Sequence, residues 1–521
     1  MVRKPANIPH DADQLRPPIV RSKGSTPSER YLAHLGDRTF LNLWSYPNPY
    51  REQKQGGRGD GKELCDLLVV CDPHVIVFSE KAIVWPDRDI DVAWGRWFRK
   101  AVLEAANQLK GAERWINEFP ERIFLDKDCN TPFPLQLPDK DRRRFHRVVV
   151  ARGAAQACRK HFGEDIGTFM IKPVITGLDH CNPKAAEYSP FTIGDLDPSG
   201  DYVHVFDETA LDVVISELDT ITDFTDYLDK RASFLRSGRV LWCHGEEELL
   251  AYYAVRINEA GDHDFTPPEG EDWTNIDGIA IGRGGYEALR KNPRYLAKKQ
   301  EDSISYAWDR LIEVFTRHMM GGTSIVLPGH SYSLLESEVA VRYMALQSRF
   351  LRRGLSKALL DALEMGKTTD KFFRLILPSE GSKGSETAFF IMTLKYLDFM
   401  DREGGYARYR QYRAFFLKTY AQAVLMKYPR LARVIGIAME PPNQGRGSSE
   451  DIIYGAQHDW SDEDRRQLQD DCDALGIMNG LKERPYTGDE FPHVADRRGG
   501  AVVGNRKQRR AQAAMMRREK R

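Results

Sequence analysis

A short stretch near the amino end of the chain concentrates the side chains whose types and spacing can do chemistry. Residues 60–81 read DGKELCDLLVVCDPHVIVFSEK. Glu63 and Asp66 stand just before one apolar run, and Glu80 and Lys81 close the next run. Two carboxylates can hold a hard divalent cation, and a lysine near the attacking water stabilises developing charge or orients the water. Metal-dependent hydrolysis of phosphodiester bonds needs this inventory.

The elements that must position these side chains are a hairpin and its neighbours. Residues 67–71 and 75–78 are apolar runs joined by the turn pair Asp72-Pro73, which predicts two short strands. A hydroxyl cap, an early proline and an acid at residues 25–29 predict the start of a helix, and residues 92–119 predict a long amphipathic helix. Further strands are expected at 40–44, 122–125, 145–151 and 168–172. The order predicts a small mixed sheet flanked by helices over residues 25–180.

This hairpin and its surroundings resemble the PD-(D/E)xK nuclease superfamily, which has the restriction-endonuclease-like fold. The resemblance covers residues 25 to about 175 and makes Glu29 the acid of the first helix, Asp66 the acid of the second strand and Lys81 the lysine of the third. Gln108, in Ala106-Asn107-Gln108-Leu109, is similar to the glutamine with which some members position the lysine or the substrate. The resemblance implies Mg²⁺ or Mn²⁺ as cofactor, nucleic acid as substrate, and Asp66 with Glu63 or Glu80 as metal ligands.

One position departs from the pattern of this superfamily. Side chains alternate along a regular strand, so a ligand on the same face as Lys81 must stand two residues before it. That residue is Ser79, and Glu80 points to the opposite face. A β-bulge at Ser79–Glu80 would bring Glu80 round, Glu63 would supply the missing carboxylate, or the site is inactive and the fold serves binding alone.

The rest of the chain has no comparable concentration of side chains that could form a catalytic site. Residues 1–24 are polar and proline-punctuated and are expected to be disordered, and residues 181–460 predict a larger, mostly helical domain with a minor sheet. Residues 461–504 predict an acidic helix and a linker, and residues 505–521 form a strongly basic tail. The expected fold class is α/β (α+β). The tail can neutralise phosphates, and it fits DNA, RNA or ribosome association equally.

Charge balance, cysteine content and hydropathy limit the classes of protein to which the chain can belong. The 521 residues carry 76 basic and 76 acidic side chains, so any attraction to nucleic acid must be local. Seven scattered cysteines without a CxxC pair indicate neither a disulfide framework nor a structural zinc site, and favour a reducing cytoplasm. The amino terminus lacks the apolar core of a signal peptide, and no apolar run is long enough for a membrane span.

Two functions of different classes follow from these residues. The first is a Mg²⁺-dependent endonuclease in which Glu63, Asp66, Glu80, Lys81 and Gln108 form the site. A helical partner domain beside such a nuclease is common in bacterial and phage-conflict systems, so the resemblance implies a defence or mobile-element setting. The second is a catalytically inactive scaffold that binds nucleic acid or ribosomes through its helical region and basic tail. In both, a protein partner would contact the helical region.

Overall fold

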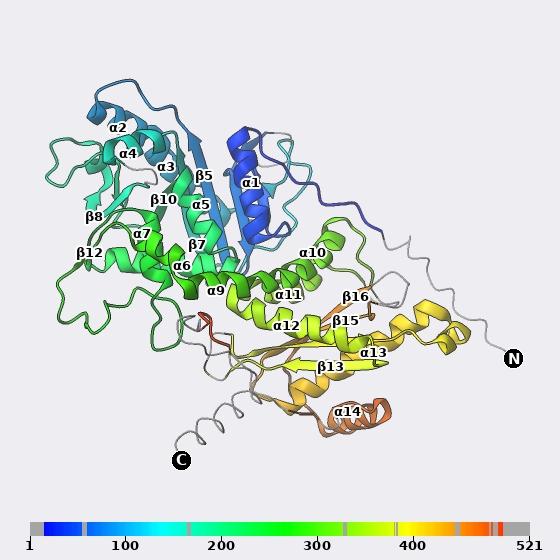
Figure 1. Cartoon of the computed structure of the whole chain (residues 1–521). Helices are drawn as coiled ribbons and strands as arrows, with labels where there is room; N and C mark the ends of the chain where they lie inside the picture. The colour runs from blue at the N-terminus through cyan, green and yellow to red at the C-terminus, as the bar shows by residue number, and fades with distance from the viewer. Residues whose placement is uncertain are drawn as a thin grey trace, which may run out of the picture.

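The computed structural model describes residues 15–54, 60–163, 168–326, 331–379, 381, 384–442, 449–478, 481–482 and 488–492. This part of the chain is a mixed α/β protein in which four sheets are interleaved with helices throughout (Figure 1). One complete four-stranded sheet is built from residues 371–456 alone. Helical residues still outnumber strand residues between residues 181 and 460, where the sequence predicts a mostly helical region with a minor sheet.

The sheet that carries the predicted site has five strands in the order β1-β4-β5-β7-β10. The first three are antiparallel neighbours, and β5, β7 and β10 run parallel. Their bounds are β1 (Ser45–Pro47), β4 (Leu67–Cys71), β5 (His74–Ala82), β7 (Arg144–Arg152) and β10 (Val203–Asp207). Because β10 pairs along its full length with β7, this sheet continues past the boundary predicted near residue 180.

Helices cover both faces of this sheet. They are α1 (Pro27–Phe40), α2 (Ile90–Phe98), a π-helical turn (Arg99–Leu103) and α3 (Glu104–Glu118). Ser79 contacts α3 through Gln108, whereas its neighbour Glu80 contacts Ser28 at the start of α1. Successive strand residues point to opposite faces, so α3 and α1 lie on opposite sides of β5.

The first helix extends further than the sequence predicts. It begins at the N-cap Thr26 with a capping box that includes Glu29. It continues to Phe40, and Leu41 ends it with a left-handed φ of 64°. The strand expected at residues 40–44 is therefore wrong, because Leu32, Leu35 and Phe40 continue the buried face of the helix and β1 starts only at Ser45.

A small antiparallel sheet stands beside the first one. Its order is β3-β2-β6, with β2 (Tyr50–Glu52), β3 (Gly61–Glu63) and β6 (Ile123–Phe124). Tyr50 pairs with both Glu63 and Phe124. This sheet holds Glu63 in a regular strand three residues before Asp66.

The third sheet, in the order β12-β11-β8-β9, follows the first in the chain. Helix α7 packs against it, and the helices up to α12 connect it to the last sheet. The bounds are α4 (Ala155–Phe162), β8 (Met170–Thr176), β9 (Thr192–Asp195), α5 (Glu208–Glu217), α6 (Ile221–Arg236), β11 (Val240–Cys243), α7 (Glu246–Ala254), β12 (Ile279–Ile281), α8 (Gly285–Lys291), α9 (Pro293–Asp302), α10 (Tyr306–Met320), α11 (Leu334–Ala345) and α12 (Arg349–Gly366).

The last sheet has the order β13-β14-β15-β16, and α12 and α13 pack against it (Figure 1). Its elements are β13 (Lys371–Ile376), β14 (Thr387–Leu394), α13 (Gly405–Lys427), β15 (Arg433–Met439), β16 (Glu450–Ala456) and α14 (Asp462–Leu475). The acidic helix predicted near residues 460–475 is confirmed as α14. The aromatic and basic side chains of α13 belong to this packing, since Tyr420 stacks on Phe373 and Arg413 pairs with Asp451.

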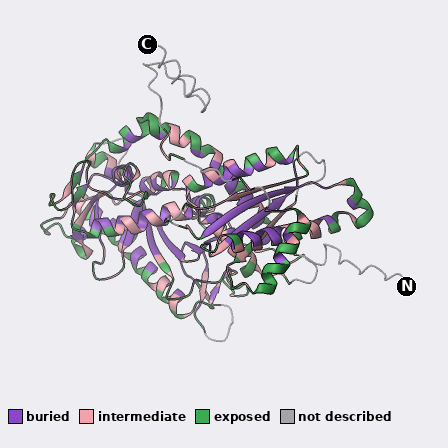
Figure 2. Ribbon diagram, turned by 90° about the horizontal axis from the view of Figure 1, so that it is seen from below, coloured by how far each residue is buried: buried purple, intermediate pink, exposed green. Residues whose placement is uncertain are grey.

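One hydrophobic core joins the two halves of the chain. Its buried apolar residues extend without a break from Leu32 in α1 to Met439 in β15. Figure 2 shows the strands as mostly buried, with exposed residues confined largely to the outer faces of helices and to loops. Among the described helices, none is both long and apolar enough to cross a lipid bilayer.

The segment before α1 is ordered from residue 15 onward, although the sequence predicts disorder up to residue 24. Arg16 N donates to Gly322 O at 3.0 Å, and Ile19 N donates to Met320 O at 2.8 Å. Arg21 pairs with Asp37 at 2.8 Å. These backbone and side-chain contacts tie the segment to the end of α10 and to α1, which a reading of local composition does not detect.

Candidate functional site

The hairpin of β4 and β5 brings Asp66 next to the end of β5. Asp66 N donates to Phe78 O at 3.1 Å, and Asp66 Oδ2 accepts a hydrogen bond from Glu80 N at 2.7 Å. The register of the hairpin, Leu67 opposite Phe78, sets Asp66 level with Ser79. The positive charge of Lys81 opposes the rise in the pKa of Asp66 that burial causes. Two of the predicted site residues, Asp66 and Lys81, are thus within electrostatic reach of each other.

Glu63 lies against Asp66. Burial and the negative charge of Asp66 raise the pKa of Glu63 to about 7, and the two carboxyl groups are close enough to share a hydrogen bond. Because two carboxylates in contact repel each other, the pair retains a proton that isolated acids would lose near pH 4.5. Paired acids that hold a proton in this way are suited to exchange it for a divalent cation.

Asn48, which the sequence analysis did not identify, connects two acids of this group. Its Nδ2 donates to Glu29 Oε2 at 2.9 Å and to Glu63 Oε1 at 3.2 Å. Ser22 Oγ donates to Asn48 Oδ1 at 3.2 Å, which fixes the orientation of the amide. Asn48 is fully buried and has a left-handed φ of 47° between two prolines, a conformation that asparagine tolerates better than most residues. The sequence Pro-Asn-Pro could have indicated this unusual backbone conformation and so pointed to Asn48.

Glu29 belongs to the same group and also caps its own helix. Its Oε2 accepts from Ser25 N at 2.8 Å as well as from Asn48. Burial alone would raise the pKa of Glu29, but the hydrogen bonds from Ser25, Asn48 and Thr26 outweigh burial and lower it. Glu29 therefore remains charged beside Glu63. We refer to Glu29, Glu63 and Asp66, with Asn48, as the carboxylate group.

Ser79 occupies the position at which the superfamily pattern has an acid. It is fully buried, and its Oγ donates to Gln108 Oε1 at 3.1 Å. Gln108 is held by α3, whose apolar positions Ala105 and Leu109 are buried against the sheet. The predicted contact between the third strand and the following helix is present, with a serine–glutamine hydrogen bond in place of a carboxylate.

Glu80 does not join the carboxylate group. Its Oε1 accepts a hydrogen bond from Arg152 Nε, and its side chain also bonds Ser28. The β-bulge that would turn Glu80 round is not found in the pairing with β7, where Ser79, Glu80 and Lys81 follow one another in unbroken register. The regular alternation of β5 thus directs Glu80 to the α1 face, where it forms an ion pair with Arg152.

The number of acids in the carboxylate group limits how it can hold a divalent cation. No group of three or more His, Cys, Asp or Glu side chains in the described residues has a spacing that could enclose a metal ion. Mg²⁺, however, commonly binds one or two carboxylates and completes its octahedral shell with water and substrate phosphate oxygens. Glu63 and Asp66 provide such a pair of hard oxygen donors, so the residues fit Mg²⁺ held jointly with a substrate.

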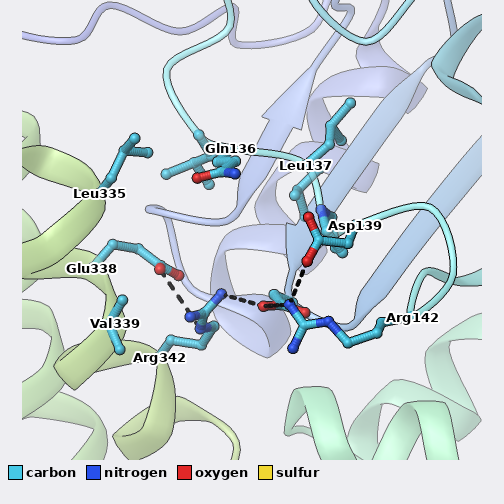
Figure 3. A pocket seen from close by; sticks show the side chains of 12 residues that line it. Gln136, Leu137, Asp139, Arg142, Leu335, Glu338, Val339 and Arg342 are labelled. Carbon is cyan, nitrogen blue, oxygen red and sulfur yellow. Dashed lines mark hydrogen bonds and ion pairs between the residues drawn. The ribbon is translucent and has the colours of Figure 1, made fainter.

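Two cavities in the described part of the chain lie away from the carboxylate group. One of about 220 Å³ lies between α11 and the 135–142 loop, at the turn of the β4–β5 hairpin. Figure 3 shows Arg342 pointing to Glu338 and Arg142 pointing to Asp139. Both arginines also pair with Asp72. Both arginines at this cavity form ion pairs with carboxylates, so they do not present free positive charge. The pair between Arg342 and Asp72 connects α11 to the hairpin.

The second cavity, of about 560 Å³, lies where β7 and β10 begin. Arg147 on its wall pairs with Glu113 and Asp201, and Arg236 pairs with Asp195. Burial and neighbouring positive charges hold the pKa of His146 and of His204 well below the usual value. Two of the arginines on the wall of this cavity are thus paired with acids, and its two histidines are neutral.

Comparison of the chain with protein-family models, with curated proteins and with solved structures finds no match. The basic tail at 505–521 lies outside the described residues.

Proposed function

We propose that this chain is a Mg²⁺-dependent nuclease whose site is the carboxylate group together with Lys81, Ser79 and Gln108. The observation that carries the proposal is the contact between Glu63 and Asp66 at the end of the hairpin, within electrostatic reach of Lys81. The element order of α1, β1, β4, β5, α3 and β7 supports a restriction-endonuclease-like core.

Each residue has a defined task in this proposal. Glu63 and Asp66 would hold the cation, and the bound ion would polarise a phosphate and favour deprotonation of the attacking water. Lys81, whose charge already acts on Asp66, would stabilise the negative charge that develops on the phosphate. Gln108 accepts from Ser79 through Oε1, which leaves its amide nitrogen without a partner among the described residues and able to donate to substrate.

Titration and cleavage assays test this proposal together. Isothermal titration of Mn²⁺ should show binding to the wild type that is lost in Asp66→Ala and retained in the matched control Asp141→Ala, an exposed acid outside the group. Cleavage of single- and double-stranded DNA and RNA with Mg²⁺ should fall by about 10²-fold or more in Lys81→Ala, the size of effect typical for loss of one charge-stabilising group. Lys100→Ala, at an exposed lysine, should cleave like the wild type. Cleavage that survives in both Asp66→Ala and Lys81→Ala would refute the proposal.

A second function has one specific observation in its favour. Ser79 stands where the pattern requires an acid, and Glu80 is engaged by Arg152. A sheet with this arrangement suits a nucleic-acid-binding protein without catalysis. In that case the wild type would bind nucleic acid equally with and without Mg²⁺, and Asp66→Ala would leave binding unchanged.

A further inference from the structure

Three cations gather beside the carboxylate group on two strands and a helix. Arg51 on β2 stands opposite Lys62 on β3 in the register of the small sheet. The guanidinium of Arg51 lies 5.3 Å from the ring centroid of Trp115 on α3. Arg114, the residue before Trp115, acts electrostatically on Arg51. We refer to Arg51, Lys62 and Arg114 as the basic patch.

The basic patch forms no ion pair with the acids of the described residues. No described carboxylate pairs with Arg51, Lys62 or Arg114, whereas Arg122 nearby pairs with Glu52 at 3.5 Å. Arg51 Nε is buried and has no hydrogen-bond partner among the described residues. Burial and the charge of Arg114 lower the pKa of Arg51. Like charges held together without a counter-charge are unfavourable unless an anion binds between them.

The basic patch and Glu63 lie on the same two strands but on opposite faces of the small sheet, because neighbouring strand residues point to opposite sides. β3 is the edge strand of this sheet, so a bound strand can pass from one face to the other around it. Lys62 directly precedes Glu63, and Arg51 directly follows Tyr50, which pairs with Glu63. Along α3, Gln108 and Trp115 are seven residues apart, which is two turns or roughly 10 Å on one side of the helix. This length corresponds to about three nucleotides of a strand that rises about 3.4 Å per nucleotide.

The arrangement favours an extended anion over a small one. The three cations come from separate elements, and none of them lines either of the two cavities described above. A small phosphate ligand is normally enclosed by its site, whereas a polymer can lie along an open surface and be neutralised at successive phosphates.

We propose that the basic patch binds the phosphate backbone of a nucleic-acid strand whose next phosphates lie at the carboxylate group. This inference rests on the proposed function, because it assigns the path of that function's substrate. Trp115 holds the guanidinium of Arg51 against its ring, so it orients the arginine toward the strand.

The test measures binding without metal, so that it does not depend on catalysis. Full-length protein is titrated into fluorescein-labelled oligonucleotides of about 20 nucleotides in EDTA, and fluorescence anisotropy is read at several salt concentrations. The variant Arg51→Gln/Lys62→Gln/Arg114→Gln is compared with Arg310→Gln/Lys427→Gln/Arg465→Gln, which removes the same charge from exposed sites elsewhere. Single-stranded DNA, duplex DNA and RNA are tested as separate probes.

We expect the patch variant to bind its best probe at least about tenfold more weakly than the wild type at ~0.1 M salt. The slope of log K against log salt should fall by about two to three, or nearly one for each lost phosphate contact. The control variant should retain the wild-type affinity and slope. Arg51→Lys, which keeps the charge, should retain most of the affinity, and far-ultraviolet circular dichroism and thermal unfolding verify that each variant is folded.

Three outcomes would overturn the inference: equal affinity of the patch variant and the wild type, an equal loss in the control variant, or no binding of any probe by the wild type. Tight binding that depends on the patch, combined with no Mg²⁺-dependent cleavage, would support the basic patch and refute the nuclease. Mg²⁺-dependent cleavage by the wild type, combined with unchanged binding by the patch variant, would support the nuclease and refute the basic patch.

Discussion

The contact between Glu63 and Asp66 gives the candidate site a titration of its own. Burial and the charge of Asp66 raise the pKa of Glu63 to about 7, whereas in the unfolded chain it lies near 4.5. Between these values the folded protein binds more protons than the unfolded chain, so the free energy of unfolding falls as pH rises through that interval. Ordering these acids therefore costs stability at neutral pH, and Asn48 offsets part of the cost by donating to both Glu63 and Glu29.

Replacing Glu63 by glutamine should remove this pH dependence. Glu63→Gln keeps an oxygen to accept from Asn48 but cannot ionise. At pH 8 without metal we expect the variant to be more stable than the wild type by about 1–2 kcal/mol, allowing for solvent screening of a partly exposed group. Below pH 4.5 the two should be equal. Urea unfolding at both pH values measures the difference, and Glu118→Gln, an exposed acid on α3, is the control. An equal difference at both pH values would contradict the assignment.

At the scale of elements, the start of α1 links helix capping to the site. Thr26 Oγ1 accepts from Glu29 N at 3.2 Å, and Glu29 Oε2 accepts in return from Ser25 N and Thr26 N. The same carboxylate oxygen accepts from Asn48. The capping box therefore fixes the rotamer with which Glu29 faces Glu63.

Loss of the cap should weaken both the helix and the site. We expect Thr26→Ala to lower the free energy of unfolding by about 1 kcal/mol, the usual value for an N-cap threonine. It should also weaken Mn²⁺ binding, because Glu29 loses its anchor. Thr26→Ser keeps the hydroxyl and should behave like the wild type in urea unfolding and in titration. A serine variant as unstable as the alanine variant would show that the methyl group, and not the cap, matters.

The elements of the site were predictable because they follow local patterns. The apolar runs of β4 and β5 and the period of α3 are legible in the sequence, and alternation along β5 correctly separates Ser79 from Glu80. The role of Asn48 was not predictable, because its hydrogen bonds join segments that only the fold brings together. The strand β14 was missed for another reason. Its eight residues are all buried, so they lack the alternation that identifies a half-exposed strand.

At the scale of the whole molecule, a segment near the carboxyl end is fixed against the helices of the middle region. Glu490 lies 3.1 Å from His263 and 3.4 Å from Lys298. Arg353 donates to the carbonyl oxygens of Asp489 and Glu490. Phe491 packs against the small apolar cluster formed with α7, α8 and α9. Residues 488–492 thereby connect the end of the described chain to α9 and α12.

The contribution of Glu490 to stability should depend on pH. Despite the opposing effect of burial, the bond with His263 lowers the pKa of Glu490 to about 2, and Glu490 raises the pKa of His263. The ion pair is fully formed at a pH above the pKa that Glu490 has in the unfolded chain and below the pKa that His263 has there. It is lost as pH rises through the raised pKa of His263 in the folded protein.

The difference in thermal midpoint between the wild type and Glu490→Gln should therefore be greatest near pH 5–6. By pH 9 it should shrink without vanishing, because Lys298 still pairs with the acid. Asp489→Asn, at a half-exposed acid 3.8 Å from Arg294, should show a small effect that does not change with pH. Differential scanning calorimetry across this pH range measures the thermal midpoints. A difference for Glu490→Gln that does not change with pH would show that His263 does not contribute to the stabilisation by Glu490.

The pairing of β10 with β7 has a consequence for how this protein can be divided. Val203–Asp207 completes the sheet that carries the candidate site, and Glu338 on α11 accepts from the buried Trp44 indole at 2.6 Å. A gene truncated at codon 180 would encode a product with an open sheet edge and an exposed indole, prone to aggregate rather than to work. Residues 25–180 therefore do not close their own core, and we expect the candidate site to fold only when the remaining two-thirds of the chain is present.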